Sequence, residues 1–103
     1  MVDLLRRLAG HPDIGPLISP EEAEVLDEVE FLDEEGRLLR VDRLIRDRSG
    51  STVVDWKSGE EGRAAQREQV ARYCRLLAQI HPGERVRGVL VYLAGGRAEE
   101  VAW

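Results

Sequence analysis

The sequence predicts a domain of the α/β (α+β) class, a mixed β-sheet flanked by helices in the order α-α-β-β-β-α-β-β. Two patterns indicate this class. Apolar and polar residues alternate between positions 29 and 58, which is the period of strands. The period then changes to that of a helix, and a nearly continuous apolar run at 85–94 is typical of a strand buried on both faces. The length of 103 residues fits one domain.

The N-terminal part is expected to be helical. Residues 2–9 predict a short helix, and a loop with three prolines is expected at 11–20. Ser-Pro-Glu-Glu at 19–22 has the pattern of a capping box, with Ser at the N-cap and Glu three residues later, and predicts a second short helix towards Leu26. Residues 1–27 are therefore expected to form a helical N-terminal segment, and the remainder the core of the same domain.

Three strands are expected to follow as a meander, at 29–33, 37–46 and 51–58. In the second strand, alternation predicts two faces, one with Leu39, Val41 and Ile45 and the other with Leu38, Asp42 and Leu44. A helix is expected at 63–80, because it has helical periodicity and is followed by Pro82-Gly83. The last two strands are expected at 85–94 and 97–102, joined by a Gly-Gly turn.

The composition excludes several classes of protein. A single cysteine, Cys74, rules out an internal disulfide and a four-cysteine metal or iron–sulfur site. No apolar run approaches the ~20 residues of a membrane span and no signal segment opens the chain, so we expect a cytoplasmic protein with no membrane contact. Residues 1–36 hold 11 acidic and 2 basic side chains, whereas residues 37–103 hold 9 acidic and 13 basic ones. The larger segment therefore leaves nucleic-acid binding open.

Charged residues interrupt two strands that a meander places side by side. Asp55 and Lys57 are two residues apart in a strand and therefore project from the same face. Asp42 interrupts the preceding strand in the same way, so it can face Asp55. Two carboxylates this close repel unless a cation lies between them, and oxygen ligands suit Mg²⁺ or Mn²⁺. The alternative is an ordinary ion pair between Lys57 and Asp55, with Asp42 solvated.

Gln69 and Tyr73 are four residues apart on the predicted helix, so they lie one above the other. Alone, this pair is better explained by a core tyrosine beside an exposed glutamine. With Asp42 and the segment Asp-Trp-Lys-Ser-Gly at 55–59, in this order and spacing, the set resembles the nuclease domain of the RecB/AddA helicase–nuclease group in the PD-(D/E)XK superfamily. The resemblance covers about residues 28–102 and implies a restriction-endonuclease-like fold.

Further segments carry the resemblance. Glu-Val-Glu-Phe at 28–31, Leu-Arg-Val-Asp-Arg-Leu at 39–44 and Gly-Val-Leu-Val-Tyr-Leu at 88–93 are each similar to segments of the family. Two features depart from it: Leu39 stands where the family usually has glycine, and no histidine lies in a Gly-x-x-His setting upstream. With one cysteine, the chain resembles the branch of the family that has no iron–sulfur cluster. It is then either a piece of a larger protein or a reduced domain.

The resemblance implies a metal-dependent DNA nuclease of repair and recombination that acts with a helicase domain or subunit. It implies that Asp42, Asp55 and the Trp56 carbonyl bind Mg²⁺ or Mn²⁺, with Glu28 as a further metal-facing acid. It also implies that Lys57 positions the attacking water and that Gln69 and Tyr73 help to hold the catalytic groups. Helix arginines are expected to contact the DNA backbone, unless they form an ordinary solvated face: Arg63, Arg67, Arg72 and Arg75.

Two alternatives to an active nuclease stay open. The first is a nuclease-fold module with an incomplete metal site that guides DNA or docks a protein, which the missing histidine, Leu39 and the acidic N-terminal segment favour. The second is an unrelated small α/β domain with a chance ion pair. The presence of five predicted catalytic residues together disfavours the first alternative: Asp42, Asp55, Lys57, Gln69 and Tyr73. Stabilisation by a divalent metal would count against the second.

Overall fold

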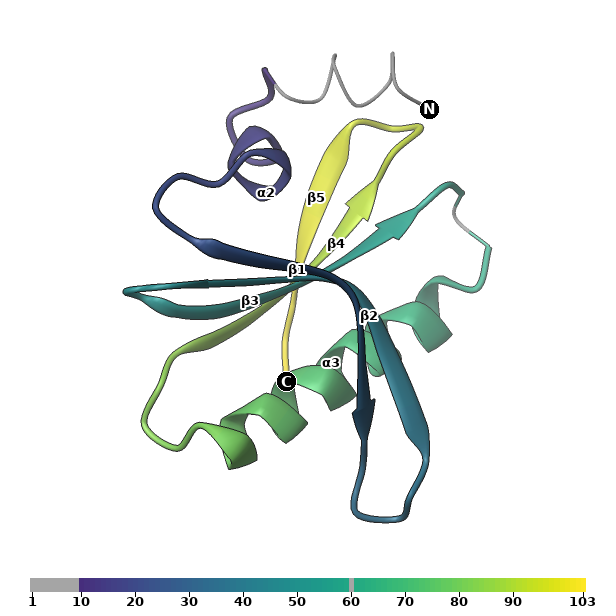
Figure 1. Ribbon diagram of the computed structural model, residues 1–103. Coiled ribbons are helices and arrows are strands. Elements are labelled where there is room, and N and C mark those ends of the chain that lie inside the picture. Colours follow the sequence, from purple (N-terminus) through teal and green to yellow (C-terminus); the bar gives the residue numbers. More distant parts are fainter. Residues whose placement is uncertain (1–9, 60) are drawn as a thin grey trace.

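The structure, a computed structural model, describes residues 10–59 and 61–103 (Figure 1). The helix predicted at 2–9 lies outside the described residues. The described elements run from a short helix through three strands, a long helix and two further strands: α2 (Gly15–Ile18), β1 (Glu24–Leu32), β2 (Leu38–Asp47), β3 (Gly50–Lys57), α3 (Arg63–Ile80), β4 (Val86–Tyr92) and β5 (Arg97–Val101). This confirms the α+β class, the strand meander and the helix at 63–80.

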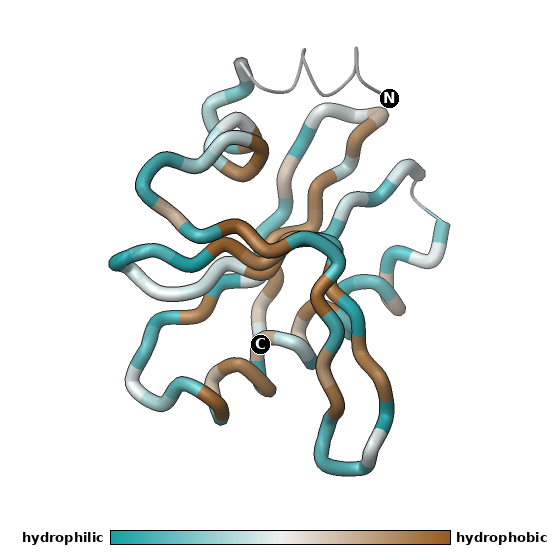
Figure 2. The backbone as a smooth tube through the Cα atoms, in the orientation of Figure 1, coloured by the Kyte–Doolittle hydropathy of each residue, from teal (hydrophilic) through white to brown (hydrophobic). Residues whose placement is uncertain are grey.

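The five strands form one mixed sheet in the order β1-β2-β3-β4-β5. Neighbouring strands are antiparallel except β3 and β4, which are parallel because α3 connects them across one face of the sheet. Figure 1 shows α3 on one side of the sheet and α2 on the other. The hydropathy colours of Figure 2 show the apolar segments gathered in the centre of the sheet, with polar segments at the outer turns.

Two apolar clusters fill the space on the two faces of the sheet. Between the sheet and α3, Tyr73 and Leu77 of the helix pack with Val53 and Leu90 of the strands. On the other face, α2 contributes Ile14 from its N-cap and Leu17, which pack against β2, β3 and β4. Among the described residues, no helix is long and apolar enough to cross a membrane.

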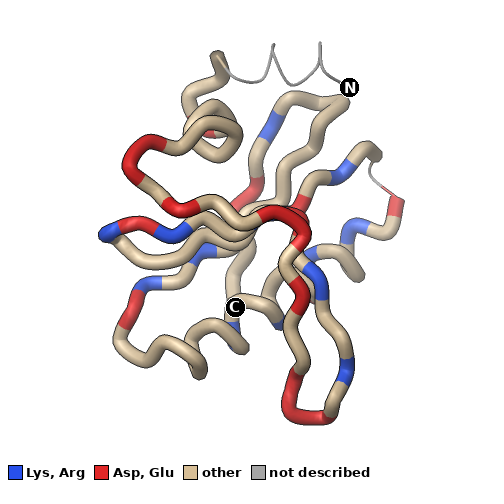
Figure 3. The backbone as a smooth tube through the Cα atoms, in the orientation of Figure 1, with Lys and Arg blue, Asp and Glu red and all other residues tan. Residues whose placement is uncertain are grey.

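The N-terminal prediction is wrong in two places. A helix, α2, lies inside the predicted loop, and the predicted helix towards Leu26 is instead the beginning of β1, which starts at Glu24. The capping-box pattern would put Glu22 in the first helical turn, but its φ is +50°, in the left-handed region, which a right-handed helix excludes. The eight residue pairs between β1 and β2 outweigh this local signal. Figure 3 shows Asp and Glu residues concentrated along this strand and the segment before it.

The predicted faces of β2 are also wrong in one half of the strand. Leu39 and Val41 pack under α3 as expected, but Leu44 joins them and Ile45 packs on the other face. The ladder of hydrogen bonds between β1 and β2 is interrupted where Glu28, with φ +52°, lies opposite Asp42. The alternation of β2 side chains between the two faces of the sheet is therefore offset by one residue beyond this point. This break in the sheet is where the candidate site lies.

Candidate functional site

Asp42 and Asp55 hold two strands together at the point where their backbones separate. The β2–β3 ladder ends at Arg43 opposite Val54. Beyond that pair, the backbone N–H of Asp42 donates to Oδ1 of Asp55 at 3.0 Å, and the N–H of Trp56 donates to Oδ2 of Asp42 at 2.9 Å. Each carboxylate thus replaces a carbonyl of the missing ladder and accepts a backbone hydrogen bond from the facing strand.

Burial makes the charge of Asp55 costly. The residue is 1% exposed and its Oδ2 accepts a hydrogen bond from Nε2 of Gln66 on α3 at 2.8 Å. Burial is the largest cause of a raised pKa of Asp55 and the negative charge of Asp42 is a smaller one, and the net pKa is about 7. The hydrogen bonds from the Asp42 N–H and from Gln66 act against this rise. A carboxyl group held in this way gains most from a neighbouring cation.

The same edge of β3 offers a third oxygen. A residue in a strand points its N–H and C=O to the same side. The Lys57 carbonyl accepts from the Leu93 N–H after β4, so Trp56, whose N–H bonds Asp42, points its carbonyl towards β2. Because β2 no longer pairs there, the Trp56 carbonyl lies at the edge that the Asp42 carboxylate occupies, and this supports the predicted ligand.

The oxygens present fit a hard divalent cation. Each carboxylate oxygen of Asp55 accepts one hydrogen bond and keeps capacity for a second partner, and no described donor contacts Oδ1 of Asp42. Mg²⁺ usually binds one or two carboxylates and completes its shell with water. Within the described part of the chain, no group of three or more His, Cys, Asp or Glu residues is placed to hold a metal. Two carboxylates and a carbonyl are therefore the donors that the fold supplies.

Lys57 lies on the same face of β3 as Asp55, as the spacing predicts, but the two do not form an ion pair. Its ammonium group donates to the Glu61 carbonyl and approaches Gly62, just before α3. Neither Asp42 nor Asp55 forms an ion pair with any described Lys or Arg residue. The ordinary ion-pair alternative therefore does not describe this arrangement.

Gln69 and Tyr73 contact each other, as their spacing predicts. Nε2 of Gln69 lies 3.2 Å from the Tyr73 hydroxyl and 3.3 Å from the Arg40 carbonyl on β2. Tyr73 is fully buried, and burial raises its pKa, with smaller contributions from the charges of Asp55 and Asp42. Through Gln69, the hydroxyl is thus connected to the β2 backbone at Arg40, two residues before Asp42. No described contact joins Gln69 or Tyr73 to Lys57.

Gln66 is a site residue that the sequence reasoning missed. Its side-chain amide hydrogen-bonds the Asp55 carboxylate from α3. The available signal was its spacing, because positions 66, 69 and 73 recur at three and four residues and share one helix face. Polar residues repeated on the sheet-facing side of a helix indicate buried polar partners.

Other predicted residues lie apart from the carboxylate pair. Glu28 is 73% exposed at its side chain, and its Oε1 accepts from Arg40 at 2.8 Å. The helix arginines differ in their partners: Arg63 and Arg67 contact Glu99 on β5, Arg75 contacts Glu68, and Arg72 has no described ion-pair partner. The metal and DNA-binding roles of these residues stay predictions.

Comparison with protein-family models and with curated proteins finds no match to this sequence.

Proposed function

We propose that this chain is a metal-dependent DNA nuclease domain of the PD-(D/E)XK type, related to the RecB/AddA repair and recombination nucleases and assisted by a helicase domain or subunit. The observation that supports this most directly is the reciprocal Asp42–Asp55 arrangement at the splayed ends of β2 and β3. The mixed sheet with α3 across the β3–β4 connection agrees with a restriction-endonuclease-like core.

In this proposal, Asp42, Asp55 and the Trp56 carbonyl would bind Mg²⁺ or Mn²⁺. The cation would supply Lewis-acid chemistry there, polarising the phosphodiester and lowering the pKa of a water molecule. Water adds to phosphorus, the P–O bond to one sugar breaks, and the departing oxygen takes up a proton. Gln66 fixes the orientation of the Asp55 carboxylate, which is a positioning role because it contacts no reacting atom.

Lys57 contributes a positive charge on the same face as Asp55. Its described hydrogen-bond partner is the Glu61 backbone carbonyl and not a carboxylate. An ammonium group in this position stabilises the negative charge that develops on the phosphate and orients the water molecule. Gln69 and Tyr73 support the β2 backbone beside Asp42 through the Arg40 carbonyl.

The test is degradation of end-labelled single- and double-stranded DNA in Mg²⁺ or Mn²⁺. The wild-type protein is compared with Asp55→Asn and Lys57→Ala, and with Asp47→Asn as a matched control. Asp47 is an exposed carboxylate at the end of β2, and it accepts hydrogen bonds from Ser49 in the turn to β3. We expect metal-dependent cleavage that Asp55→Asn and Lys57→Ala abolish and that Asp47→Asn leaves unchanged. Cleavage that survives Asp55→Asn would contradict the assignment.

A second candidate is a nuclease-fold module that binds DNA or a protein without cutting. The observation that favours it is the donor set, since the described part of the chain brings only two carboxylates together and Glu28 turns to Arg40. This candidate predicts that a folded protein is stabilised by Mg²⁺ and binds DNA, yet cleaves neither strand in either metal.

A further inference from the structure

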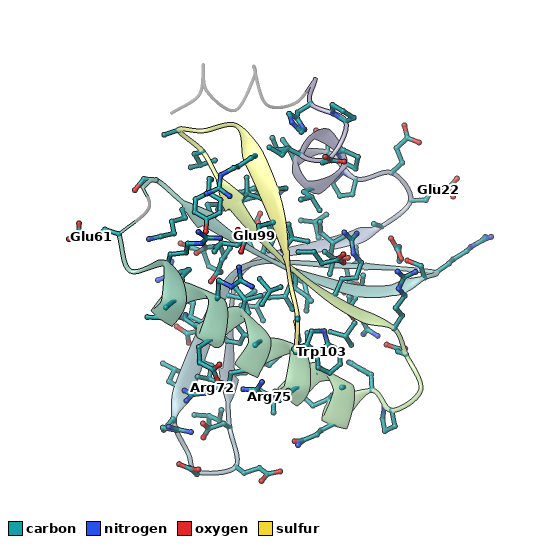
Figure 4. All side chains as sticks on the ribbon, turned by 180° about the vertical axis from the view of Figure 1, so that it is seen from behind. Glu22, Glu61, Arg72, Arg75, Glu99 and Trp103 are labelled. Atoms are coloured by element: carbon teal, nitrogen blue, oxygen red, sulfur yellow. The ribbon has the colours of Figure 1, made fainter. Side chains whose placement is uncertain are left out.

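A groove lies between α3 and the part of β2 that no longer pairs with β3. Two adjoining hollows form it, and Leu39 and Arg72 line both of them. The hollow nearer the candidate site has a volume of about 470 Å³, within the usual range for ligand pockets, and is also lined by Arg40, Gln69 and Tyr73. We name this hollow the β2–α3 pocket. Figure 4 shows Arg72 between α3 and the β1–β2 hairpin.

The β2–α3 pocket has an unused hydrogen-bond acceptor and an unused donor. The Arg40 carbonyl can only accept, so Nε2 of Gln69 faces it and Oε1 of Gln69 points away, where no described donor contacts it. The Tyr73 hydroxyl accepts from the same Nε2, and its own proton has no described acceptor although the residue is fully buried. A buried O–H without an acceptor is unfavourable, so a ligand that accepts this proton would be stabilised.

Arg72 supplies a planar cation to the pocket. Ala65, Gln69 and Arg72 recur at four and three residues along α3, so they lie on one flank of the helix. Arg72 is half-buried and contacts no described carboxylate, whereas Arg75 on the same helix pairs with Glu68. A guanidinium group that no carboxylate holds is able to stack its plane on a flat ring.

These groups fit a nucleobase better than a phosphate or a peptide. A nucleobase has flat faces that stack on a guanidinium plane or on apolar side chains such as Leu39, and an edge that both donates and accepts. A phosphate only accepts, so it would leave Oε1 of Gln69 without a partner, and the Glu68 carboxylate in the pocket would repel it. A peptide strand would pair with the free edge of β2, where Gln69 already contacts the Arg40 carbonyl.

We propose that the β2–α3 pocket binds one unpaired base of the DNA strand that is cut. This rests on the proposed function, because the pocket includes Arg40, two residues before Asp42 on β2, a separation of about 7 Å along a strand. A nucleotide whose phosphate lies at the carboxylate pair would then place its base in the pocket. In this proposal Arg72 and Gln69 position the base and contact no reacting atom.

The test is binding of fluorescent oligonucleotides in EDTA, measured by anisotropy. One probe is a short oligothymidine, and the other has the same length and the same phosphates but abasic sugars. We expect the wild-type protein to bind the oligothymidine about tenfold more tightly, the ratio that stacking of one base produces. Equal binding of the two probes would overturn the proposal.

Ala65→Glu tests whether this preference arises in the pocket. Ala64→Glu is the matched control, because Ala64 is also exposed but lines a separate hollow beside the end of β5. Both variants add the same charge in the first turn of α3, where a carboxylate favours the helix, so both should fold. We expect Ala65→Glu to abolish the preference for bases and Ala64→Glu to retain it. Loss of the preference in both variants, or in neither, would overturn the assignment to this pocket.

Duplex probes distinguish the source of the base. Tighter binding of a duplex with a single-stranded overhang than of a blunt duplex assigns the base to a single strand, and equal binding assigns it to a base that leaves the duplex. Because EDTA removes the metal, binding of a base is measured separately from cleavage. A protein that prefers bases but does not cut DNA in Mg²⁺ or Mn²⁺ would overturn the proposed nuclease function and leave the pocket assignment in place.

Discussion

Replacement of Asp55 by asparagine should stabilise the metal-free protein above neutral pH. Asp55 has a pKa of about 7 in the folded chain against an ordinary value of 3.8. A raised carboxyl pKa means that the folded state binds the proton more tightly than the unfolded state. Asp55 therefore stabilises the fold when protonated, and this contribution is lost as the pH rises from about 4 through 7.

The magnitude follows from the pKa difference. Each unit corresponds to about 1.4 kcal/mol, so the free energy of unfolding should fall by about 3 kcal/mol between pH 5 and pH 8. A small domain has a total of only about 5–15 kcal/mol. Asparagine has nearly the same shape, and its Oδ1 still accepts the Asp42 N–H, while its amide donates to Gln66 once that side-chain amide turns over. Asp55→Asn should therefore be nearly insensitive to pH in this interval and more stable than wild type at pH 8, by up to about 4 kcal/mol.

The assay is urea unfolding in EDTA at several pH values between 5 and 8. Asp47→Asn is the control with the opposite sign, because hydrogen bonds from Ser49 lower the pKa of Asp47, so loss of its charge should destabilise the fold. A wild-type stability that stays constant or increases from pH 5 to pH 8 would refute the reasoning. So would an Asp55→Asn protein that is less stable than wild type at pH 8.

Three further predictions follow from the same contacts. If Mg²⁺ binds with a dissociation constant of about 1 mM, about 10 mM Mg²⁺ at pH 8 should stabilise the wild-type protein by about 1.4 kcal/mol. Differential scanning calorimetry should then show a rise of the melting temperature by roughly 5–10 °C, and Asp55→Asn should lack this rise. Gln66→Ala should raise the pKa of Asp55 further, because the Gln66 hydrogen bond lowers it, and ¹³C NMR titration of the carboxyl would show an unchanged pKa if that bond is absent. Gly88→Ala should lower the free energy of unfolding by about 1–3 kcal/mol, because its Cβ would lie 2.7 Å from Val70 Cγ1 and 2.8 Å from Cys74 Sγ. An unchanged midpoint of urea unfolding would contradict this packing.

The parts of the fold that could be predicted from sequence are those with a strong period. Helix α3 has the predicted bounds, and all five strands are present, because apolar alternation and the apolar run before Tyr92 are long enough to exclude other structures. The proximity of Asp42 to Asp55 could also be predicted, since a meander places consecutive strands side by side. These features depend on local pattern and on one simple rule of topology.

The parts that could not be predicted depend on pairing between distant residues. Local capping residues favoured a helix before Leu26, whereas the hydrogen bonds of β1 with β2 make it a strand. The shift of face between Val41 and Leu44 arises because Glu28 and Asp42 interrupt the ladder together, and no pattern within β2 alone reveals it. Gln66 was missed because its partner comes from another element.

The contacts at the break between β2 and β3 show which property of the two aspartates the fold needs and which it does not. Both carboxylates accept backbone hydrogen bonds that the ladder no longer supplies, and this alone would stabilise the break. An asparagine oxygen would accept the same hydrogen bonds without placing a buried negative charge next to another. The fold therefore requires an acceptor at each position but not a charge, and the charge of Asp55 opposes folding above pH 7. A charge that the fold does not require is explained if a cation binds there, and Asp55→Asn tests this directly, since it keeps the acceptor and removes the charge.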